Sequence, residues 1–310
     1  MKTINLKKKT KNIIRSVINF FIRLPIRFVE SYTKIVSAIH PSLANMIYSL
    51  GIELIDKRKS SIQISKEKSL ILFTPNSVCK MRADTFFSKE PETIEWIQEF
   101  STKENRSGPI LIDIGGNIGI YSIFNSLKFG NKSLIFEPSP LNIKQLFKNI
   151  NINKVSDLCH VSTMPLSNTN SINTFNISSL EDGGALSGFG VDYGFDGKYL
   201  ETIASVKTAG ITLDKYIELF YPIKEHETFI VKLDVDGIEH LILSGAEKTL
   251  KNKNCLSVCV EVNEDFEEQK NDIESLLTEY GFDLKAKKQS LMSKNSNLFS
   301  TSYNYIYLKK

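Results

Sequence analysis

Short apolar runs alternate with longer segments of helical periodicity from residue 110 onward. The apolar runs have the length of buried strands, and the segments between them repeat apolar residues at helical spacing. The alternation predicts an open α/β sheet with mostly parallel strands, whose ligands bind at the carboxyl ends of the strands. Predicted strands cover residues 110–114, 133–136, 157–163, 228–235, 255–262, 282–287 and 303–309, and predicted helices cover 118–128, 140–151, 212–220, 238–250 and 266–279.

The segment before this alternation, residues 60–107, mixes two kinds of pattern. A helix over Glu90–Phe100 is predicted by Pro91 and by the acidic residues in its first turn. Strand-like runs precede it at Ser61–Ser65, Leu70–Phe73 and Val78–Met81. We expect a cap of strands and helix that leads into the main domain.

The chain then divides into three parts. Its length of 310 residues and hydrophobic content of 41% suffice for a full core. We expect a basic, amphipathic helical extension over residues 1–59, the cap over 60–107, and the main domain over 108–310. Residues 165–210, rich in Ser, Asn and Gly, interrupt the main domain as an insertion.

Charge is distributed unevenly along the chain. The net charge is +4, but residues 1–34 hold nine Lys or Arg against one acid, so they carry +8 and the remainder carries −4. A mildly acidic body argues against a nucleic-acid enzyme. Within the basic segment, Ile14, Val17, Ile18 and Phe21 recur at helical spacing. Such a helix either lies in an anionic membrane surface or packs on its own domain.

No segment predicts membrane spanning or export. Arg15 and Arg23 interrupt the apolar part of the N-terminal segment, and no small-residue cleavage site follows. Residues 35–52 lack charge but are too polar for a transmembrane helix. The cysteines and histidines show no spacing typical of a zinc site. We expect a soluble cytoplasmic protein, either free or peripheral at the cytoplasmic membrane face.

The most informative segment is a glycine-rich turn between a predicted strand and a predicted helix. Residues 111–119 read Leu-Ile-Asp-Ile-Gly-Gly-Asn-Ile-Gly, with glycines at 115, 116 and 119. Glycine lets the backbone approach a ligand closely, and the helix start behind it presents unpaired N–H groups. Glu137 ends the next predicted strand, where its carboxylate can accept both hydroxyl protons of a ribose. Together these features predict an adenosine site.

The residues within this turn favour S-adenosylmethionine over NAD. Dinucleotide sites use G-x-G-x-x-G, because the second glycine lets pyrophosphate approach the helix start. Here Asn117 occupies the place of that glycine. The carboxylate of Asp113 would repel an anion but hold an ammonium and a sulfonium. The alternative is an ordinary strand-turn-helix without a ligand.

A second informative segment, residues 229–240, places charges on a predicted central strand. Side chains alternate along a strand, so Lys232, Asp234 and Asp236 share one face. Charges there are costly unless they are paired or functional, which leaves open a structural ion pair or a catalytic role. Asp236 and Glu239 have the spacing of a capping box for helix 238–250, and capping is compatible with catalysis.

Two further segments carry candidate groups. Glu261 ends a strand at the same predicted sheet edge, where it is either functional or simply solvated. Residues 181–197 hold six glycines and three aromatic residues, Phe189, Tyr193 and Phe195. This composition predicts either a mobile substrate lid with flat faces for a sugar ring or a disordered surface loop.

Ordered motifs recur over about residues 73–285. They are Pro75-Asn76, Lys89–Ile97, Asp113–Ser122, Phe136–Ser139 with Asn142, Lys232–Glu239, Gly245-Ala246 and Val260–Asn263. In this order the motifs resemble the FkbM-type S-adenosylmethionine-dependent methyltransferases. One departure is Gly116, where the family commonly has alanine. Residues 1–60 lie outside the resemblance.

The resemblance implies both a fold and a reaction. The fold is an open, mostly parallel seven-stranded sheet of the class I methyltransferase (Rossmann-like) type, and the reaction is methyl transfer to oxygen. The acceptor in this family is often a sugar or polyketide hydroxyl, in pathways for surface polysaccharides. We therefore expect an O-methyltransferase acting on a small-molecule or lipid-linked saccharide. The alternatives are a cofactor-binding module without catalysis and an NAD-dependent sugar-modifying enzyme, and the sequence leaves the oligomeric state open.

Roles for individual residues follow from these segments and from the resemblance. We expect Asp113 and the turn 115–119 near the methionine end of the cofactor, Glu137 on the ribose, and residues 163–167 against the adenine. The acceptor hydroxyl needs a base or a divalent ion held by carboxylates, and the sequence does not decide between them. The expected cofactor residues are Asp113, Gly115, Gly116, Asn117, Gly119, Tyr121, Glu137, Pro138, Asn142, Met164 and Leu166, and the expected catalytic residues are Lys232, Asp234, Asp236, Glu239 and His240.

Overall fold

The computed structural model describes residues 23–101 and 108–310. The chain divides into two compact units, Met1–Arg58 and Lys59–Lys310. In its described part the first unit consists of two helices, residues 23–39 and α2 (Pro41–Asp56), which meet at His40. The expected apolar stripe at Ile14–Phe21 lies outside the described residues.

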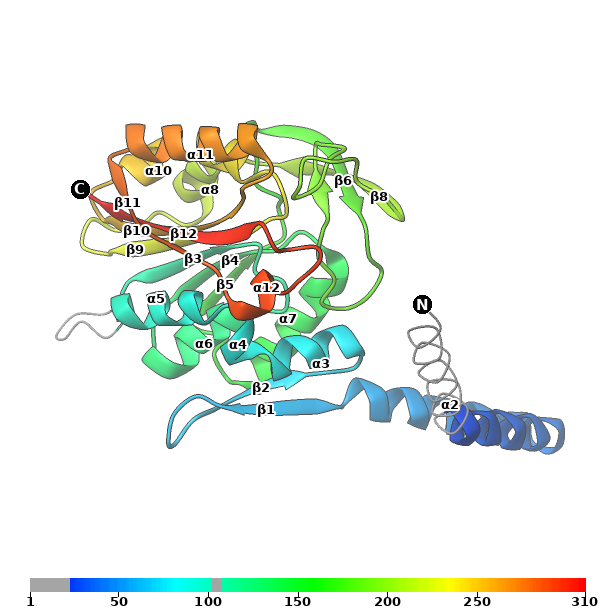
Figure 1. Cartoon of the computed structure of the whole chain (residues 1–310). Helices are drawn as coiled ribbons and strands as arrows, with labels where there is room; N and C mark the ends of the chain where they lie inside the picture. Colours follow the sequence, from blue (N-terminus) through cyan, green and yellow to red (C-terminus); the bar gives the residue numbers. More distant parts are fainter. Residues whose placement is uncertain (1–22, 102–107) are drawn as a thin grey trace, which may run out of the picture. The chain divides into compact units, whose positions relative to one another are not determined.

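The second unit is built on a seven-stranded sheet with the strand order β11-β12-β10-β9-β3-β4-β5 (Figure 1). The strands β5, β4, β3, β9 and β10 pair in parallel, whereas β12 runs antiparallel to both β10 and β11. This arrangement confirms the predicted open, mostly parallel sheet. The strands are β3 (Ile110–Ile114), β4 (Ser133–Phe136), β5 (Cys159–Ser162), β9 (Phe229–Leu233), β10 (Cys255–Asn263), β11 (Phe282–Lys288) and β12 (Ser302–Lys309).

Helices cover both faces of this sheet, so its central strands are buried on both sides (Figure 1). Along β3, Ile110 and Ile112 belong to the core under the later helices, while Leu111 belongs to the core under the earlier ones. This double burial explains why β3 reads as a continuous apolar run rather than an alternating one. One face carries α5 (Pro91–Ser101), α6 (Ile120–Phe129) and α7 (Pro140–Ile152), and the other carries α8 (Leu213–Phe220), α9 (Glu239–Ser244), α10 (Glu247–Lys251) and α11 (Glu267–Glu279).

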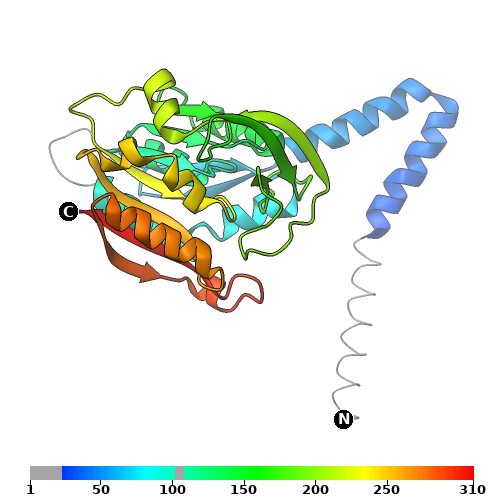
Figure 2. The same ribbon diagram turned by 90° about the horizontal axis from the view of Figure 1, so that it is seen from above.

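Helix α11 runs along the side of the sheet that holds β11 and β12 (Figure 2). On the opposite face, α5 packs its single tryptophan into the core. Trp96 is 1% exposed, and its indole Nε1–H donates to the Ser257 hydroxyl of β10 at 2.9 Å. A buried indole N–H needs such a partner, so this bond fixes α5 on the sheet.

A hairpin of β1 (Lys59–Gln63) and β2 (Ser69–Phe73) precedes the main sheet. The free edge of β2 is closed by two asparagine side chains, one from α7 and one from the residue that caps its C-terminus, rather than by another strand. Asn149 and Asn153 accept hydrogen bonds from the backbone N–H groups of Phe73 and Ile71, at 2.8 and 2.9 Å. These side-chain amides hydrogen-bond backbone N–H groups of β2 that would otherwise be free to pair with another strand.

The predicted strand at Val78–Met81 is wrong, because these residues belong to helix α3 (Ser77–Asp84). Asn76 caps this helix, accepting the backbone N–H of Cys79 at 2.8 Å. A short apolar run is compatible with either a strand or a helix, and the N-cap formed by Asn76 favours the helix here. Helix α4 (Phe86–Lys89) follows directly.

The insertion 165–210 forms a small antiparallel sheet of β6 (Ser171–Ile177), β7 (Gly188–Phe189) and β8 (Ala204–Gly210). The predicted helix 238–250 is divided into α9 and α10 around Gly245. A Cβ atom at Gly245 would lie 2.4 Å from the carbonyl oxygen of Ser167, so the start of the insertion passes directly over this break. A last short helix, α12 (Leu291–Lys294), lies between β11 and β12 in the sequence.

Candidate functional site

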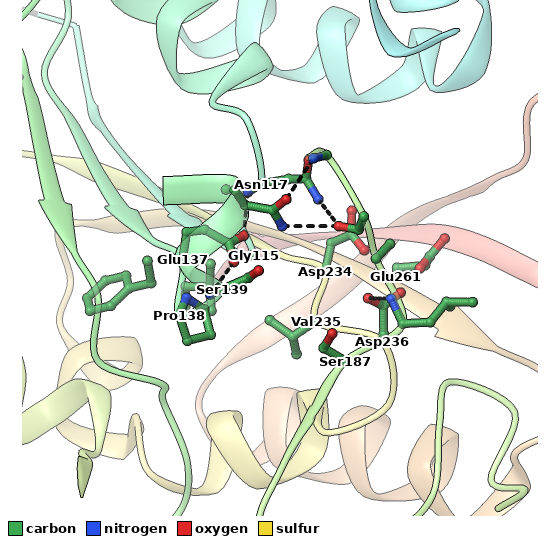
Figure 3. A pocket seen from close by; sticks show the side chains of 18 of the residues that line it. Gly115, Asn117, Glu137, Pro138, Ser139, Ser187, Asp234, Val235, Asp236 and Glu261 are labelled. Atoms are coloured by element: carbon green, nitrogen blue, oxygen red, sulfur yellow. Dashed lines mark hydrogen bonds between the residues drawn. The ribbon is translucent and has the colours of Figure 1, made fainter. Parts of the chain in front are cut away.

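A cavity of about 470 Å³ lies at the carboxyl ends of β3, β4, β9 and β10. This volume is in the range of small-molecule sites. Figure 3 shows Glu137 toward one end and Asp234, Asp236 and Glu261 toward the other. The predicted residues in the wall are Gly115, Gly116, Asn117, Tyr121, Glu137, Pro138, Asn142, Met164, Leu166, Lys232, Asp234 and Asp236, whereas Asp113, Gly119, Glu239 and His240 are not among the lining residues.

The glycines of the turn after β3 are required by close packing. Gly115 has a φ of +86°, and a Cβ atom there would lie 1.8 Å from the carbonyl oxygen of Asp234. Gly119 has a φ of +83°, and its Cβ would meet Leu146 of α7 at 2.3 Å. Gly115 therefore lets β3 and β9 converge at the cavity, while Gly119 lets α6 pack against α7.

Glu137 joins the two turns that enclose one end of the cavity. Its Oε2 accepts the backbone N–H of Asn117 and its Oε1 accepts that of Ser139, both at 2.8 Å. Burial raises the pKa of Glu137 to about 7, although these N–H donors lower it. Each oxygen keeps a lone pair, so the carboxylate is oriented to accept two further hydroxyl protons.

Asp113 is placed differently from the expectation. It is 1% exposed at the end of β3, and its carboxylate accepts the Ser122 hydroxyl of α6 at 2.6 Å. Burial raises its pKa, and the ammonium group of Lys232 on the neighbouring strand opposes that rise. Asp113 therefore lies behind the cavity wall, where it helps to hold α6 and to balance the charge of Lys232.

The wall next to Glu137 is apolar. Met164 and Leu166 line it from the segment after β5. Phe136, Phe175 and Phe189 complete this wall. A flat, uncharged ring can pack here while Glu137 holds its polar substituent.

Lys232 is the positive centre of the opposite wall. It is 3% exposed, and its Nζ donates to Asp234 Oδ2 at 2.8 Å. Burial alone would lower the pKa of Lys232, but Asp234 and Asp113 keep it raised, so the ammonium stays charged. Burial also acts to raise the pKa of Asp234, yet Lys232 holds it at about 2. The ion pair, which the sequence left open as one of two alternatives, is therefore present, and it lines the cavity.

Asp236 sits in a strained turn after β9. Its φ is +62°, which a non-glycine residue rarely adopts, and Gly237 follows with a φ of +130°. The carboxylate Oδ2 accepts the backbone N–H of Leu186 at 2.6 Å. Burial, and then the charge of Asp234, raise the pKa of Asp236 to about 6. The turn thus directs a carboxylate of unusually high basicity into the cavity.

The predicted capping box is not formed. Helix α9 begins at Glu239 without a side-chain cap, because Asp236 bonds to Leu186 instead. The Glu239 carboxylate accepts the backbone N–H groups of Val235 and Gly237 and the side-chain amide of Gln269. Burial raises its pKa to about 8. Glu239 therefore holds the turn rather than facing the cavity.

His240 also turns away from the cavity. Its ring centroid lies 6.3 Å from that of Phe266. Burial lowers its pKa, so the ring is neutral at pH 7. This environment makes His240 a packing residue of α9.

Glu261 brings a third carboxylate to the acidic end of the cavity. Ligand atoms of Asp234, Asp236 and Glu261 lie within 4.8 Å of one another. Burial, followed by the charges of Asp234 and Glu90, raises the pKa of Glu261 well above its ordinary value. Neighbouring carboxylates at this spacing repel one another, so ionisation of Glu261 is disfavoured.

A segment of the insertion, residues 182–187, closes over the cavity and is called the strap below. The amide of Asn117 donates to the Gly184 carbonyl at 2.7 Å, and Asn142 accepts the Gly183 N–H at 2.9 Å. Arg82 of α3 donates to the Gly183 carbonyl at 2.8 Å. With the bond from Leu186 to Asp236, the strap is attached to both ends of the cavity.

The aromatic residues of the insertion do not form the expected open face. Phe189 lines the cavity, but Tyr193 packs against Phe266 with ring centroids 5.6 Å apart. Phe195 packs against Phe299 at 5.1 Å. These two aromatic rings anchor the insertion to the rest of the unit.

Three charged lining residues were not predicted: Arg82, Lys89 and Glu90. Glu90 forms an ion pair with Lys89 and accepts the Tyr121 hydroxyl at 2.9 Å. Lys89 and Glu90 stood in a recognised motif, but only the tertiary packing of α3 and α4 brings them to the cavity. The sequence predicted a strand in place of helix α3, so it gave no signal that would bring Arg82 to the cavity.

The fold and this site define a class I S-adenosylmethionine-dependent methyltransferase: the sheet order is that of the class, and Glu137 follows the glycine turn on the adjacent strand. The chain belongs to the family of the methyltransferase FkbM domain, which matches residues 113–284. No curated protein matches the chain.

Several solved structures are similar at low identity. A ribosomal protein L11 methylase from Lactobacillus delbrueckii subsp. bulgaricus is 12% identical over 72% of this chain and 78% of its own, with a TM-score of 0.38. A precorrin-6y C5,15-methyltransferase from Geobacter metallireducens is 9% identical over 70% and 87%, with a TM-score of 0.39. An rRNA methylase from Streptococcus thermophilus is 12% identical over 70% and 96%, with a TM-score of 0.39.

Proposed function

We propose that this methyltransferase acts on a hydroxyl oxygen of a sugar or glycan precursor. The observation that carries the proposal is one continuous cavity with a nucleoside-type end at Glu137 and an acid-base end at Asp236 (Figure 3). S-adenosylmethionine supplies an electrophilic methyl group on a sulfonium when it is bound. The protein then has to align an acceptor oxygen, exclude water and remove a proton.

The residues at the nucleoside end fit this cofactor. Glu137 would accept the ribose hydroxyls, since both of its oxygens are oriented by backbone N–H groups and retain lone pairs. Met164 and Leu166 would pack against the adenine. No step of the reaction depends on these groups beyond holding the cofactor in place.

Asp236 is the best candidate for the base among the acidic groups near the cavity. Asp234 is paired with Lys232, and burial together with the charges of Asp234 and Glu90 disfavours ionisation of Glu261. Glu239 does not line the cavity, and its carboxylate accepts hydrogen bonds from three donors. Asp236 lines the cavity and has a pKa of about 6, which is suited to proton removal near neutral pH. Glu137 also lines the cavity with a pKa of about 7, but it lies at the end assigned to the cofactor. The proton of the acceptor hydroxyl would pass to Asp236 as the new oxygen–carbon bond forms, and from there to solvent.

The acid-base end also favours a polyhydroxylated acceptor. Glu90 and Asp234 accept hydrogen bonds, and Arg82 and Lys89 donate them, all within one wall. Leu298 and Phe299 add apolar surface to the lining of the cavity. Such a mixture of charged and apolar groups is typical of sites that recognise sugar rings by their hydroxyls and their flat faces.

The test is a comparison of glycans from cells with and without the protein. Mass spectrometry should show the loss of one O-methyl group when the protein is absent. Purified protein should convert S-adenosylmethionine to its demethylated product when the matching acceptor is added, and D236N protein should not. Calorimetry should show heat of binding with S-adenosylmethionine and with its demethylated product, S-adenosylhomocysteine, and none with NAD. Binding without turnover on any glycan would indicate a binding module, and tight NAD binding would indicate an oxidoreductase.

A further inference from the structure

The first unit exposes a row of apolar side chains along residues 23–39. These side chains follow one another at intervals of three and four positions, so they form one stripe on the helix. They are Leu24, Phe28, Tyr32, Ile35 and Ile39, with exposed fractions of 48%, 73%, 51%, 63% and 79%. Exposed apolar stripes of this length mark a surface that is covered by a partner.

Helix α2 carries a second stripe of the same kind. It contains no charged residue from Pro41 to Ile52. Its stripe consists of Leu43, Met46, Leu50 and Leu54, with exposed fractions of 40%, 53%, 50% and 74%. The buried positions of the two helices, Thr33 and Ala44, lie off both stripes. The exposed stripes are therefore separate from the positions at which these helices are already packed.

The charges of this region select the partner. On the helix of residues 23–39 the charged residues follow their own stripe beside the apolar one, at Arg23, Arg27, Glu30 and Lys34. Residues 1–34 together carry +8. A second copy of the chain would bring two such charges together, which is unfavourable, whereas anionic headgroups would neutralise them.

We propose that the first unit docks on an anionic membrane surface, with both apolar stripes in the interfacial region and the basic residues at the headgroups. Within residues 23–101 and 108–310, no helix is long and apolar enough to cross a membrane. A helix pair of this composition lies in the interface instead. The inference does not depend on the reaction that the second unit performs.

The experiment measures sedimentation of the full chain with vesicles. Phosphatidylcholine vesicles that contain phosphatidylglycerol should pellet the protein, and vesicles of phosphatidylcholine alone should pellet much less. Raising NaCl from about 0.1 M to about 0.5 M should weaken the binding, since it shortens the screening length.

Matched variants separate the apolar stripe from charge. M46E/L50E places two acids on the stripe of α2, and N45E/S49E places two acids one position earlier, at exposed residues off the stripe. The stripe variant should lose about tenfold or more in vesicle affinity, and the control should lose much less. F28S/I35S removes apolar area from the other helix without a change of charge and should also weaken binding. Circular dichroism checks that all variants keep their helices.

Three outcomes would overturn the proposal. The wild-type chain could fail to pellet with anionic vesicles, or M46E/L50E and N45E/S49E could bind equally. Sedimentation velocity could instead show a dimer that M46E/L50E dissociates, which would assign the stripes to a second copy. A lower melting temperature of the second unit in M46E/L50E without any effect on vesicle binding would assign them to the protein's own surface.

Discussion

The backbone N–H of Leu186 donates to Asp236 Oδ2 at 2.6 Å, across 50 positions of sequence. Both residues adopt left-handed conformations, with φ of +64° and +62°. Such backbone is costly outside glycine and persists where surrounding structure enforces it. The bond uses one lone pair of Oδ2 and leaves both lone pairs of Oδ1 free of it, so Oδ1 is the better placed oxygen of Asp236 to take a proton from an acceptor.

Replacing Asp236 by asparagine should separate binding from turnover. D236N keeps the size of the side chain and an oxygen for the Leu186 bond but cannot accept a proton, so kcat should fall by about 10²–10⁴-fold. The affinity for S-adenosylhomocysteine, measured by calorimetry, should stay within about threefold of wild type. D192N, an exposed aspartate in the same insertion, is the control and should leave both quantities unchanged. If D236N lost cofactor affinity by as large a factor as it lost kcat, the assigned role of Asp236 would be contradicted.

The rate should fall at acidic pH because the base must be ionised. Burial and Asp234 raise the pKa of Asp236 to about 6, while Arg82 and Lys89 oppose that rise. With the cofactor saturating, so that Glu137 does not affect the rate, kcat/KM for the acceptor should drop by about tenfold per pH unit below pH 6 and level off above it. The residual activity of D236N should lack this limb. A wild-type profile that stays flat down to pH 5 would exclude Asp236 as the base.

Local sequence carries the features that depend on neighbours in the chain. The turn at Gly115 and the carboxylate of Glu137 were predictable, because a strand, a turn and a helix start follow each other directly. The capping box was not, since Asp236 bonds to Leu186 from a distant segment. The strand at Val78–Met81 was wrong because Asn76 caps a helix there. Without that helix, Arg82 could not be assigned to the cavity.

Glu137 should govern cofactor affinity. E137A removes a charged acceptor of hydroxyl hydrogen bonds and should weaken binding of S-adenosylhomocysteine by about 1.5–3 kcal/mol. The affinity of the wild-type protein should also fall below pH 7. The pKa of Glu137 in the cofactor-free protein is about 7, and the ribose hydroxyls need its ionised form as an acceptor. Calorimetry over a pH series measures both effects. As a control, E201A, at an exposed position, should bind the cofactor like wild type. Wild-type affinity in E137A would show that Glu137 does not bind the cofactor.

Two glycines with similar φ separate conformational strain from steric overlap. Gly130 has a φ of +74° and nothing within 4 Å of its Cβ direction, so G130A should cost only about 1–2 kcal/mol of unfolding free energy. G115A adds an overlap with the Asp234 backbone at 1.8 Å and should cost clearly more. Chemical denaturation of both variants measures the difference. Equal stabilities would show that β3 and β9 can separate without loss.

Removal of divalent ions tests the alternative to a base. If Asp236 removes the proton, protein treated with EDTA and desalted should keep its turnover, and added Mg²⁺ should change the rate by less than about twofold. The Lys232 ammonium already neutralises Asp234, which is one of the three clustered carboxylates. Loss of activity after EDTA, restored by Mg²⁺ alone, would assign this cluster to a metal ion instead.

The position of Trp96 gives the protein an internal optical probe. It is the single tryptophan of the sequence, it is buried between α5 and β10, and it is not among the residues that line the cavity. Its emission should therefore be blue-shifted in the folded state and move to longer wavelength only when α5 leaves the sheet. Tryptophan fluorescence can therefore follow unfolding of the second unit in the presence of vesicles or of S-adenosylhomocysteine, since neither is expected to contact the indole.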